Sequence, residues 1–374
     1  MKKEYYVVLH GAKKNAGDFL IKNRAMALLK HLKPERELIE FPHWKPLEDH
    51  LDVINKSLAL VIMGGPGLQS NIYPRVYPLT KDLNQINVPI YLMGSGSYML
   101  PFNSRAIETF QFTKSSLEFL NKCSGISVRD LFTYNLMKTK NFHKVSMTGC
   151  PAWYELNSIN SPVKLPSKIK KIIVSAPQRK NYFPQLIDIL KAIKARYSEW
   201  EIIVTFNRGF KADQYTSARV ANYLKYYKQK IEELGIPVLN AAYNIDLLEE
   251  HNDADLHIGY RLHSHIHYFS IRKPSYLIAE DSRGRGNIDT IRIPGFSGIE
   301  HSSFADVFIY PNSDLIRNIS IKLLPIIKLD KYLPSKLISQ LEYDIDNNFS
   351  TYSHLSSMID NNFKIMQRFI QTLP

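Results

Sequence analysis

The sequence has only two cysteines, Cys123 and Cys150, in 374 residues. Two are too few for a disulfide framework, and their spacing is not that of a zinc site, so we expect a reducing, cytosolic setting and no metal held by cysteine. Long apolar runs are also missing. No stretch reaches the roughly 18 apolar residues of a membrane span, and the run at 5–9 is too short for a signal-peptide core. We therefore expect neither a spanning nor a secretory segment.

Acidic residues are outnumbered by basic ones, 35 against 48, which gives a formal net charge of +13. Such a balance suits anionic partners: phosphorylated small molecules, an acidic polymer, an anionic membrane face or nucleic acid. The lysines are scattered and no nucleic-acid motif occurs, so we expect no nucleic-acid partner. A solvated basic surface explains much of the charge. Peripheral contact with the anionic inner face of a membrane is compatible with the rest.

Short apolar runs alternate with helical stretches in both halves of the chain. This alternation predicts parallel sheets covered by helices on both faces. Helices are expected near 183–197 and 216–234, with a short one over 245–251. The predicted strands are 4–10, 37–41, 58–63, 89–93, 125–128 and 144–149 in the first half, and 171–176, 201–206, 237–240, 255–260 and 274–280 in the second.

The chain is longer than the roughly 250 to 300 residues at which one hydrophobic core stops growing. We predict an α/β protein with two Rossmann-like domains facing a cleft. The N-terminal domain covers 1–155, a linker without apolar periodicity covers 156–170, and the C-terminal domain covers 171–330. A tail over 331–374 has leucines at helical spacing and is expected to pack as helices over the two domains.

The segment LHGAKKNAGDFL, 9–20, follows the first predicted strand and opens a helix at Gly17 and Asp18. Ligands of open α/β folds bind at this edge of the sheet, near free helix amides. Asp18 either caps the helix or faces the cleft, where it could assist catalysis. Lys13 and Lys14 either meet an anion or face water.

Two glycine-rich turns follow successive predicted strands: GGPG, with Gly64 and Gly65, and GSGS at 94–97. Neither matches a P-loop or a dinucleotide-binding fingerprint, but together they suggest a cleft lining. Arg129 and Asp130 follow the strand at 125–128. They are either a surface arginine beside a helix cap, or cleft residues in which the guanidinium of Arg129 binds a carboxylate or phosphate.

The stretch GYRLHSHIHYFSIRKP, 259–274, has histidines at every second position: His263, His265 and His267. On a strand all three imidazoles would share a face, whereas on a helix only His263 and His267 would. The preceding strand ends at Gly259 and the apolar residues that follow have helical spacing, so we predict a helix. A three-histidine metal site then has no geometric basis.

On this interpretation Arg261, Leu262 and His263 occupy a strand-to-helix turn that points at the cleft. His263 is the best acid/base candidate, because imidazole exchanges a proton near neutral pH. His265 and His267 are expected to be structural. After the next strand, EDSRGRGNID, 280–289, is predicted to be a glycine-bearing loop that presents Asp281, Arg283 and Arg285 to the cleft or to solvent.

Taken together, these segments resemble the polysaccharide pyruvyl transferase family. The matching stretches lie in consistent order between residues 10 and 290: NAGDFLIKNRA, MGGPG, ISVRDLFTYNLM, VSMTGCPAW and GYRLHSHIHYFSIRKPSYLI. The resemblance implies a GT-B-like arrangement, with an acceptor-side N-terminal domain and a donor-side C-terminal domain. It also implies transfer of the pyruvyl unit of phosphoenolpyruvate to two hydroxyls of a sugar, forming a ketal in surface polysaccharide or cell-wall glycan synthesis.

By the same resemblance, Arg129, Arg261, Leu262 and His263 contact the donor, and His263 transfers protons. We expect Asp18 or Asp130 to assist it as catalytic residues. Gly64, Gly65 and Arg283 are expected to complete the phosphoenolpyruvate site.

The expected partners are phosphoenolpyruvate and a sugar or lipid-linked oligosaccharide, with no cofactor and no metal. Relatives carry a glycine and an apolar residue where this chain has Ser264 and His265, and three glycines where it has GGPG. Two alternatives stay open: a GT-B-like glycosyltransferase with a nucleotide-sugar donor, and a catalytically silent glycan-binding protein of the same fold.

Overall fold

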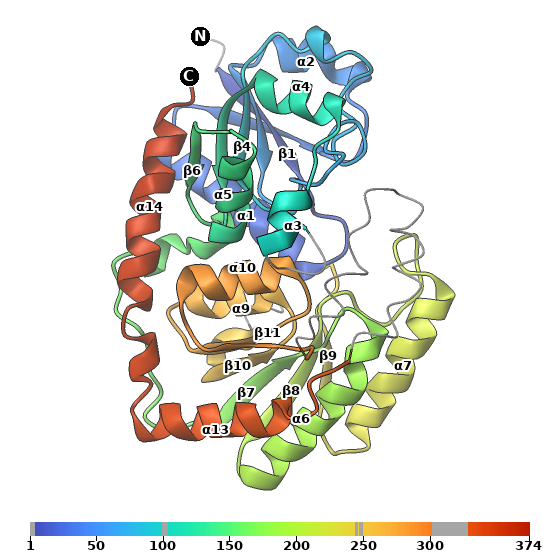
Figure 1. The fold of residues 1–374 in the computed structure, drawn as a ribbon, viewed down its shortest axis with the longest axis vertical. Coiled ribbons are helices and arrows are strands. Elements are labelled where there is room, and N and C mark those ends of the chain that lie inside the picture. The colour runs from blue at the N-terminus through green and yellow to red at the C-terminus, as the bar shows by residue number, and fades with distance from the viewer. Residues whose placement is uncertain (1–3, 99–103, 244–245, 247–249, 301–327) are drawn as a thin grey trace.

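The computed structural model describes residues 4–98, 104–243, 246, 250–300 and 328–374. Within this part of the chain, the strands form two six-stranded parallel sheets, one in each half of the sequence (Figure 1). Parallel sheets are covered on both faces, which explains why their strands are almost continuous apolar runs. All five residues of β3 (Ala59–Met63) are buried, as are all five of β11 (Ser275–Ala279).

The first sheet has the strand order β2-β1-β3-β4-β5-β6. Its other strands are β1 (Tyr5–His10), β2 (Glu37–Pro42), β4 (Ile90–Ser95), β5 (Cys123–Val128) and β6 (Val145–Met147). The helices of this domain are α1 (Ala16–Leu32), α2 (Leu51–Asn55), α3 (Ser104–Thr109), α4 (Lys114–Lys122) and α5 (Leu131–Thr139).

The second sheet has the order β12-β11-β10-β7-β8-β9. Its strands are β7 (Lys171–Ser175), β8 (Glu201–Phe206), β9 (Val238–Asn240), β10 (Leu256–Gly259), β11 and β12 (Gly295–Ser297). The helices are α6 (Phe183–Arg196), α7 (Ala218–Glu232), α9 (Leu262–Ser270) and α10 (Ser282–Ile291). The predicted helix at 245–251 falls largely outside the described residues.

One apolar cluster runs through both domains. Trp153, in the short 3-10 helix Pro151–Trp153 between the sheets, is fully buried and meets Phe269 of α9 edge to face with ring centroids 5.8 Å apart. Because this contact joins the end of the first domain to the second domain through apolar packing, the two domains share part of their core.

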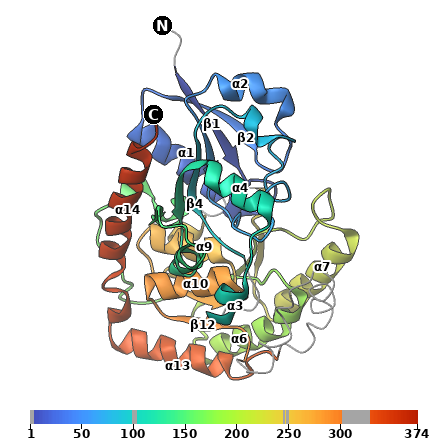
Figure 2. The same ribbon diagram turned by 45° about the horizontal axis from the view of Figure 1, so that its top comes forward.

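The tail forms two helices, α13 (Leu333–Asp346) and α14 (Leu355–Gln371), as predicted. α13 packs on α6, and α14 runs along both domains toward the first sheet (Figure 1, Figure 2). The carbonyls of its last residues accept hydrogen bonds from the first domain, from Lys33 Nζ at 2.7 Å and from Tyr91 Oη at 3.0 Å. At its other end, Asp360 pairs with the buried Arg272 at 2.6 Å. The C-terminal tail therefore contacts both domains and holds them together.

The segment after β11 is the main correction to the predicted elements. We expected a loop over 280–289, but Asp281 caps a buried helix, α10, by accepting a hydrogen bond from the backbone of Arg283 at 3.0 Å. Its glycines permit close approach: a Cβ on Gly286 would lie 3.0 Å from Asp130 Oδ1, across the domain boundary. Glycine thus serves helix packing here, which a loop interpretation of the sequence misses.

Candidate active site

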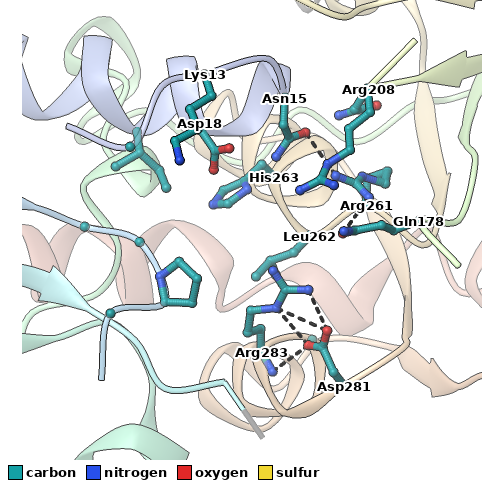
Figure 3. Close-up of a pocket in the computed structure, with 18 of the residues that line it drawn as sticks. Lys13, Asn15, Asp18, Gln178, Arg208, Arg261, Leu262, His263, Asp281 and Arg283 are labelled. Carbon is teal, nitrogen blue, oxygen red and sulfur yellow. Dashed lines mark hydrogen bonds and ion pairs between the residues drawn. The ribbon is translucent and has the colours of Figure 1, made fainter. Parts of the chain in front are cut away.

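A cavity of about 330 Å³ lies between the two domains, at the carboxyl ends of strands from both sheets (Figure 3). This is where ligands bind in open α/β folds, since loops and helix N-termini converge there. Its lining includes Lys13, Asn15, Asp18, Gly64 and Gly65 from the first domain, and Gln178, Arg208, Arg261, Leu262, His263, Glu280, Asp281 and Arg283 from the second.

The turn between β10 and α9 is built as the sequence indicates. Gly259 ends the strand at φ +144°, where a Cβ would lie 2.4 Å from the carbonyl oxygen of Ser175. This close approach aims Arg261 across the cavity. Its guanidinium donates to Asn15 Oδ1 of the other domain at 2.9 Å and to Gln178 Oε1 at 3.2 Å. Burial and the neighbouring Arg208 lower the pKa of Arg261 to about 10, so it remains charged at neutral pH.

His263 lies directly against the first turn of α1. A Cβ on Gly17 would lie 2.4 Å from His263 Nδ1, so only glycine leaves room for the imidazole. Its Nε2 has no hydrogen-bond partner among the described residues. Burial, followed by the charges of Arg129, Arg283 and Arg261, holds the pKa of His263 well below its usual range. The imidazole is therefore neutral in the unliganded protein and able to accept a proton.

Asp18 belongs to the cavity and is not a helix cap. Asn15 occupies the cap position of α1, and Asp18 lies in its first turn. Figure 3 shows the carboxylate of Asp18 turned toward the ring of His263. Burial raises the pKa of Asp18, while Arg208 and Arg261 oppose the shift. Of the two roles that the sequence left open, the structure supports the cleft position.

Asp130 follows the helix-cap alternative that the sequence left open, whereas Arg129 is not a surface residue. Neither is among the residues that line the described cavity. Asp130 is buried and caps α5 by accepting a hydrogen bond from the backbone of Thr133 at 2.7 Å, and its other carboxylate oxygen lies 3.4 Å from Arg129 Nε. Arg129 is 2% exposed, and its two terminal nitrogens have no partner in the described part of the chain. Its charge acts on His263 from behind the cavity wall.

The remaining predicted residues line the cavity. Gly64 and Gly65 both have positive φ, +60° and +80°, as a turn that brings backbone to a ligand requires. Leu262 also lines it. Arg283 projects from α10 and forms an ion pair with Asp281 at 2.5 Å (Figure 3). Arg285 instead pairs with Asp289 on the outer side of the helix, at 2.9 Å, and is not among the lining residues.

A model of the polysaccharide pyruvyl transferase family matches residues 15–282. The chain belongs to this family. Membership makes the protein a transferase, and the matched segment contains the cavity wall from Asn15 to Asp281.

Solved structures show the same architecture. The transferase resembles a UDP-GlcNAc 2-epimerase from Neisseria meningitidis bound to UDP-GlcNAc, at 9% identity and a TM-score of 0.51, covering 96% of this chain and 98% of that one. A candidate UDP-N-acetylglucosamine 2-epimerase from Listeria monocytogenes gives 11% identity and a TM-score of 0.51, over 98% and 94%. These likenesses establish the GT-B fold. A search of curated proteins finds no match.

Sequence reasoning missed Arg208, Asn15 and Gln178. Arg208 follows β8 in the stretch TFNRG, where polar residues after a buried strand were the available signal. Asn15 stands one residue before the helix and is recruited by Arg261 from the other domain. Its role depends on a contact between domains that residue spacing within one segment does not reveal.

The two lysines of the first loop, Lys13 and Lys14, have different surroundings and different roles. Lys13 lines the cavity of the transferase and lies over the ring of Trp44, 4.3 Å from its centroid. Lys14 is buried and crosses the domain boundary, where its ammonium pairs with Asp213 at 2.6 Å and donates to Thr216 Oγ1 at 2.6 Å. Lys14 therefore links the two domains by an ion pair, and Lys13 is the lysine available to an anion.

His265 and His267 are core residues, as predicted. His265 Nδ1 lies 2.7 Å from Ser275 Oγ, and His267 Nε2 lies 2.8 Å from Asn252 Oδ1. Among the residues that the structure describes, there is no group of three or more histidine, cysteine, aspartate or glutamate side chains that could hold a metal ion. None of the described helices is long and apolar enough to cross a membrane.

Proposed function

We propose that this transferase moves the pyruvyl unit of phosphoenolpyruvate onto two hydroxyls of a sugar, forming a pyruvate ketal in surface polysaccharide or cell-wall glycan synthesis. The observation that carries the proposal is His263: a neutral imidazole with an unpartnered Nε2, facing a cavity that holds Arg261 and Arg283. The donor concentrates a carboxylate and a phosphate on three carbons, and two guanidinium groups suit both.

One histidine with a neighbouring carboxylate can carry out all the proton transfers that the reaction requires. The methylene carbon of the donor gains a proton, and positive charge develops at the central carbon. Two sugar hydroxyls then add in turn, each losing a proton, and inorganic phosphate leaves with its oxygen. One proton from the hydroxyls replaces the proton given to carbon, and the other leaves with phosphate.

The charges around His263 explain how it can protonate the methylene carbon in the first step. In the unliganded protein, burial and then the charges of Arg129, Arg283 and Arg261 keep His263 deprotonated. A trianionic donor neutralises those charges and brings negative charge beside the ring, so the pKa of His263 rises when the donor binds. The imidazole then donates a proton to the methylene carbon and later accepts one from a hydroxyl. Asp18, turned toward the ring, stabilises the imidazolium.

The sugar is assigned to the N-terminal side of the cavity. That side is lined by Gly11, His43, Gln69 and Tyr77 beside the Gly64–Gly65 turn, and carries fewer charges than the opposite wall. Burial lowers the pKa of His43 to about 4, so it is neutral as well. Uncharged hydrogen-bonding groups suit hydroxyls, whereas the arginine side suits the donor.

The deciding assay measures phosphate release from phosphoenolpyruvate with a panel of lipid-linked and nucleotide-linked sugars. Thermal shifts with phosphoenolpyruvate and with nucleotide sugars separate the two donor classes, because a ligand stabilises the state that binds it. Stabilisation by a nucleotide sugar alone would replace the proposal with a glycosyltransferase. We place the reaction in the cytoplasm, beside anionic lipid, and pelleting with liposomes that does not depend on their anionic lipid content would contradict that placement.

Lys14→Met should weaken donor binding without touching the donor. Losing the ion pair with Asp213 loosens the contact that holds the Lys13–Asn15 loop against the C-terminal domain. We expect the KM for phosphoenolpyruvate to rise about tenfold with kcat nearly unchanged, as loss of one charge-assisted contact implies. Lys22→Met, which breaks a more exposed ion pair between α1 and Glu40 of β2 within the first domain, is the matched control. Equal changes of KM in both variants would show that the ion pair between Lys14 and Asp213 does not support donor binding.

A further inference from the structure

Ser175, the last residue of β7, holds the turn that carries Arg261 at two points. Its carbonyl oxygen accepts a hydrogen bond from the backbone of Tyr260 at 3.1 Å, and its hydroxyl accepts one from the backbone of Arg261 at 3.0 Å. Ser175 is fully buried. The position of the Arg261 backbone therefore depends on the orientation of one buried hydroxyl.

That hydroxyl begins a chain of buried side chains that crosses the core of the second domain. Ser175 Oγ lies 2.9 Å from His257 Nε2, and His257 Nδ1 lies 2.7 Å from Ser275 Oγ. Ser275 Oγ lies in turn 2.7 Å from His265 Nδ1. All four side chains have 0% exposure, so water does not complete their hydrogen bonds.

Only one direction gives both hydroxyl protons in this chain an acceptor within it. The backbone of Arg261 can only donate, so the hydroxyl of Ser175 accepts from it and gives its own proton to His257 Nε2. His257 then carries its proton on Nδ1 and donates to Ser275. The hydroxyl of Ser275 donates to His265 Nδ1, which places the proton of His265 on Nε2. The two histidines are thus opposite tautomers.

The chain connects the turn that presents Arg261 to the core of the second domain. At one end is the turn with Arg261, and at the other is His265 of α9, with His257 of β10 and Ser275 of β11 between them. A buried polar network costs desolvation that an apolar core avoids, and what a fully satisfied one contributes is a unique geometry.

We propose that Ser175 and His257 are positioning residues that fix Arg261 for anion binding, acting through its backbone and touching no substrate. The proposal rests on the proposed function only for the identity of the donor. An arginine held within a few tenths of an ångström by buried supports binds an anion better than one on an unsupported turn.

The first test is a double-mutant cycle with Ser175→Ala and Arg261→Ala, read as the Kd of phosphoenolpyruvate and of inorganic phosphate. Ser175→Ala should weaken binding about three- to tenfold in the wild-type background. With Arg261→Ala present, it should weaken binding less than about twofold, because a residue that acts through Arg261 has nothing left to position. Ser270→Ala, which removes an equally buried hydroxyl of α9 bonded to the carbonyl of His267, is the control and should change neither Kd.

An equal loss in both backgrounds would overturn the proposal, because it would show a role independent of Arg261. If Ser175→Ala does not fold, Ser275→Ala breaks the chain one link further on and must show the same dependence on Arg261. Failure of phosphoenolpyruvate to bind the wild-type protein, with phosphate binding intact, would refute the donor and leave the cycle measurable with phosphate.

The direction of the chain is tested without ligand. Nitrogen-15 NMR of the histidine rings should show His257 protonated on Nδ1 and His265 on Nε2. The same tautomer at both rings would contradict the chain as described.

Discussion

The variant His263→Gln is expected to retain its fold and its affinity for phosphoenolpyruvate while losing turnover by a factor of about 10² to 10⁴, the usual contribution of a positioned acid/base group. Glutamine hydrogen-bonds but does not exchange a proton near neutral pH. The side chain is replaced at a position where Gly17 leaves little room, and glutamine is flexible enough to fit. The measurement is kcat for phosphate release, with the Kd of phosphoenolpyruvate by calorimetry.

His267→Gln is the matched control, since His267 lies one turn further along α9, is buried and bonds to Asn252 away from the cavity. It should lose some stability and keep kcat within about threefold. If both variants lose kcat equally, His263 is a packing residue of α9 and the acid/base assignment is wrong. If His263→Gln keeps full turnover, the proton donor must be another group.

The sheet was predictable because its strands are buried on both faces. The central strands read as short continuous apolar runs, so boundaries such as those of β3 and β8 follow from the sequence within one or two residues. The edge strand β12, with the sequence GFS, has no such run and was not predicted. α10 was not predictable in this way. Its segment SRGRGNID combines glycine and charge, the composition of a loop, and becomes a helix only because Asp281 caps it and Gly286 fits against the other domain.

Some residues of the site could likewise be predicted from the sequence, and others could not. The turn of Arg261 and His263 could be located because Gly259 marks the strand end and helical spacing follows. The role of Asp130 stayed open because a carboxylate after a strand suits both a cap and a catalytic group, and only the structure shows the capping bond to Thr133. The roles of Gly17 and Asn15 depend on partners more than 240 residues away, His263 and Arg261, and no spacing within a segment carries that information.

Acidification is expected to unfold the transferase well above the pH at which carboxylates titrate. Burial lowers the pKa of six histidines: to about 4 for His43 and His251, to about 3 for His265, well below the usual range for His257 and His263, and below the usual value for His10. The unfolded chain takes up these protons below about pH 6.5 and the folded chain does not. Stability is therefore full above pH 6.5 and falls as the pH decreases.

Each such histidine lowers the free energy of unfolding by up to about 1.4 kcal/mol per pH unit, and a typical protein has only about 5–15 kcal/mol. Urea midpoints should thus drop steeply between about pH 6.5 and 5. The raised pKa values of Asp18, Asp130 and Glu280 act in the opposite sense, from the ordinary carboxylate pKa upward. His251→Leu tests the cause, because neither ring nitrogen of His251 has a partner among the described residues. Its removal should reduce the slope by about one proton. A midpoint that stays constant over this range would show that the buried histidines take up protons while folded, and would contradict the neutral His263 on which the mechanism depends.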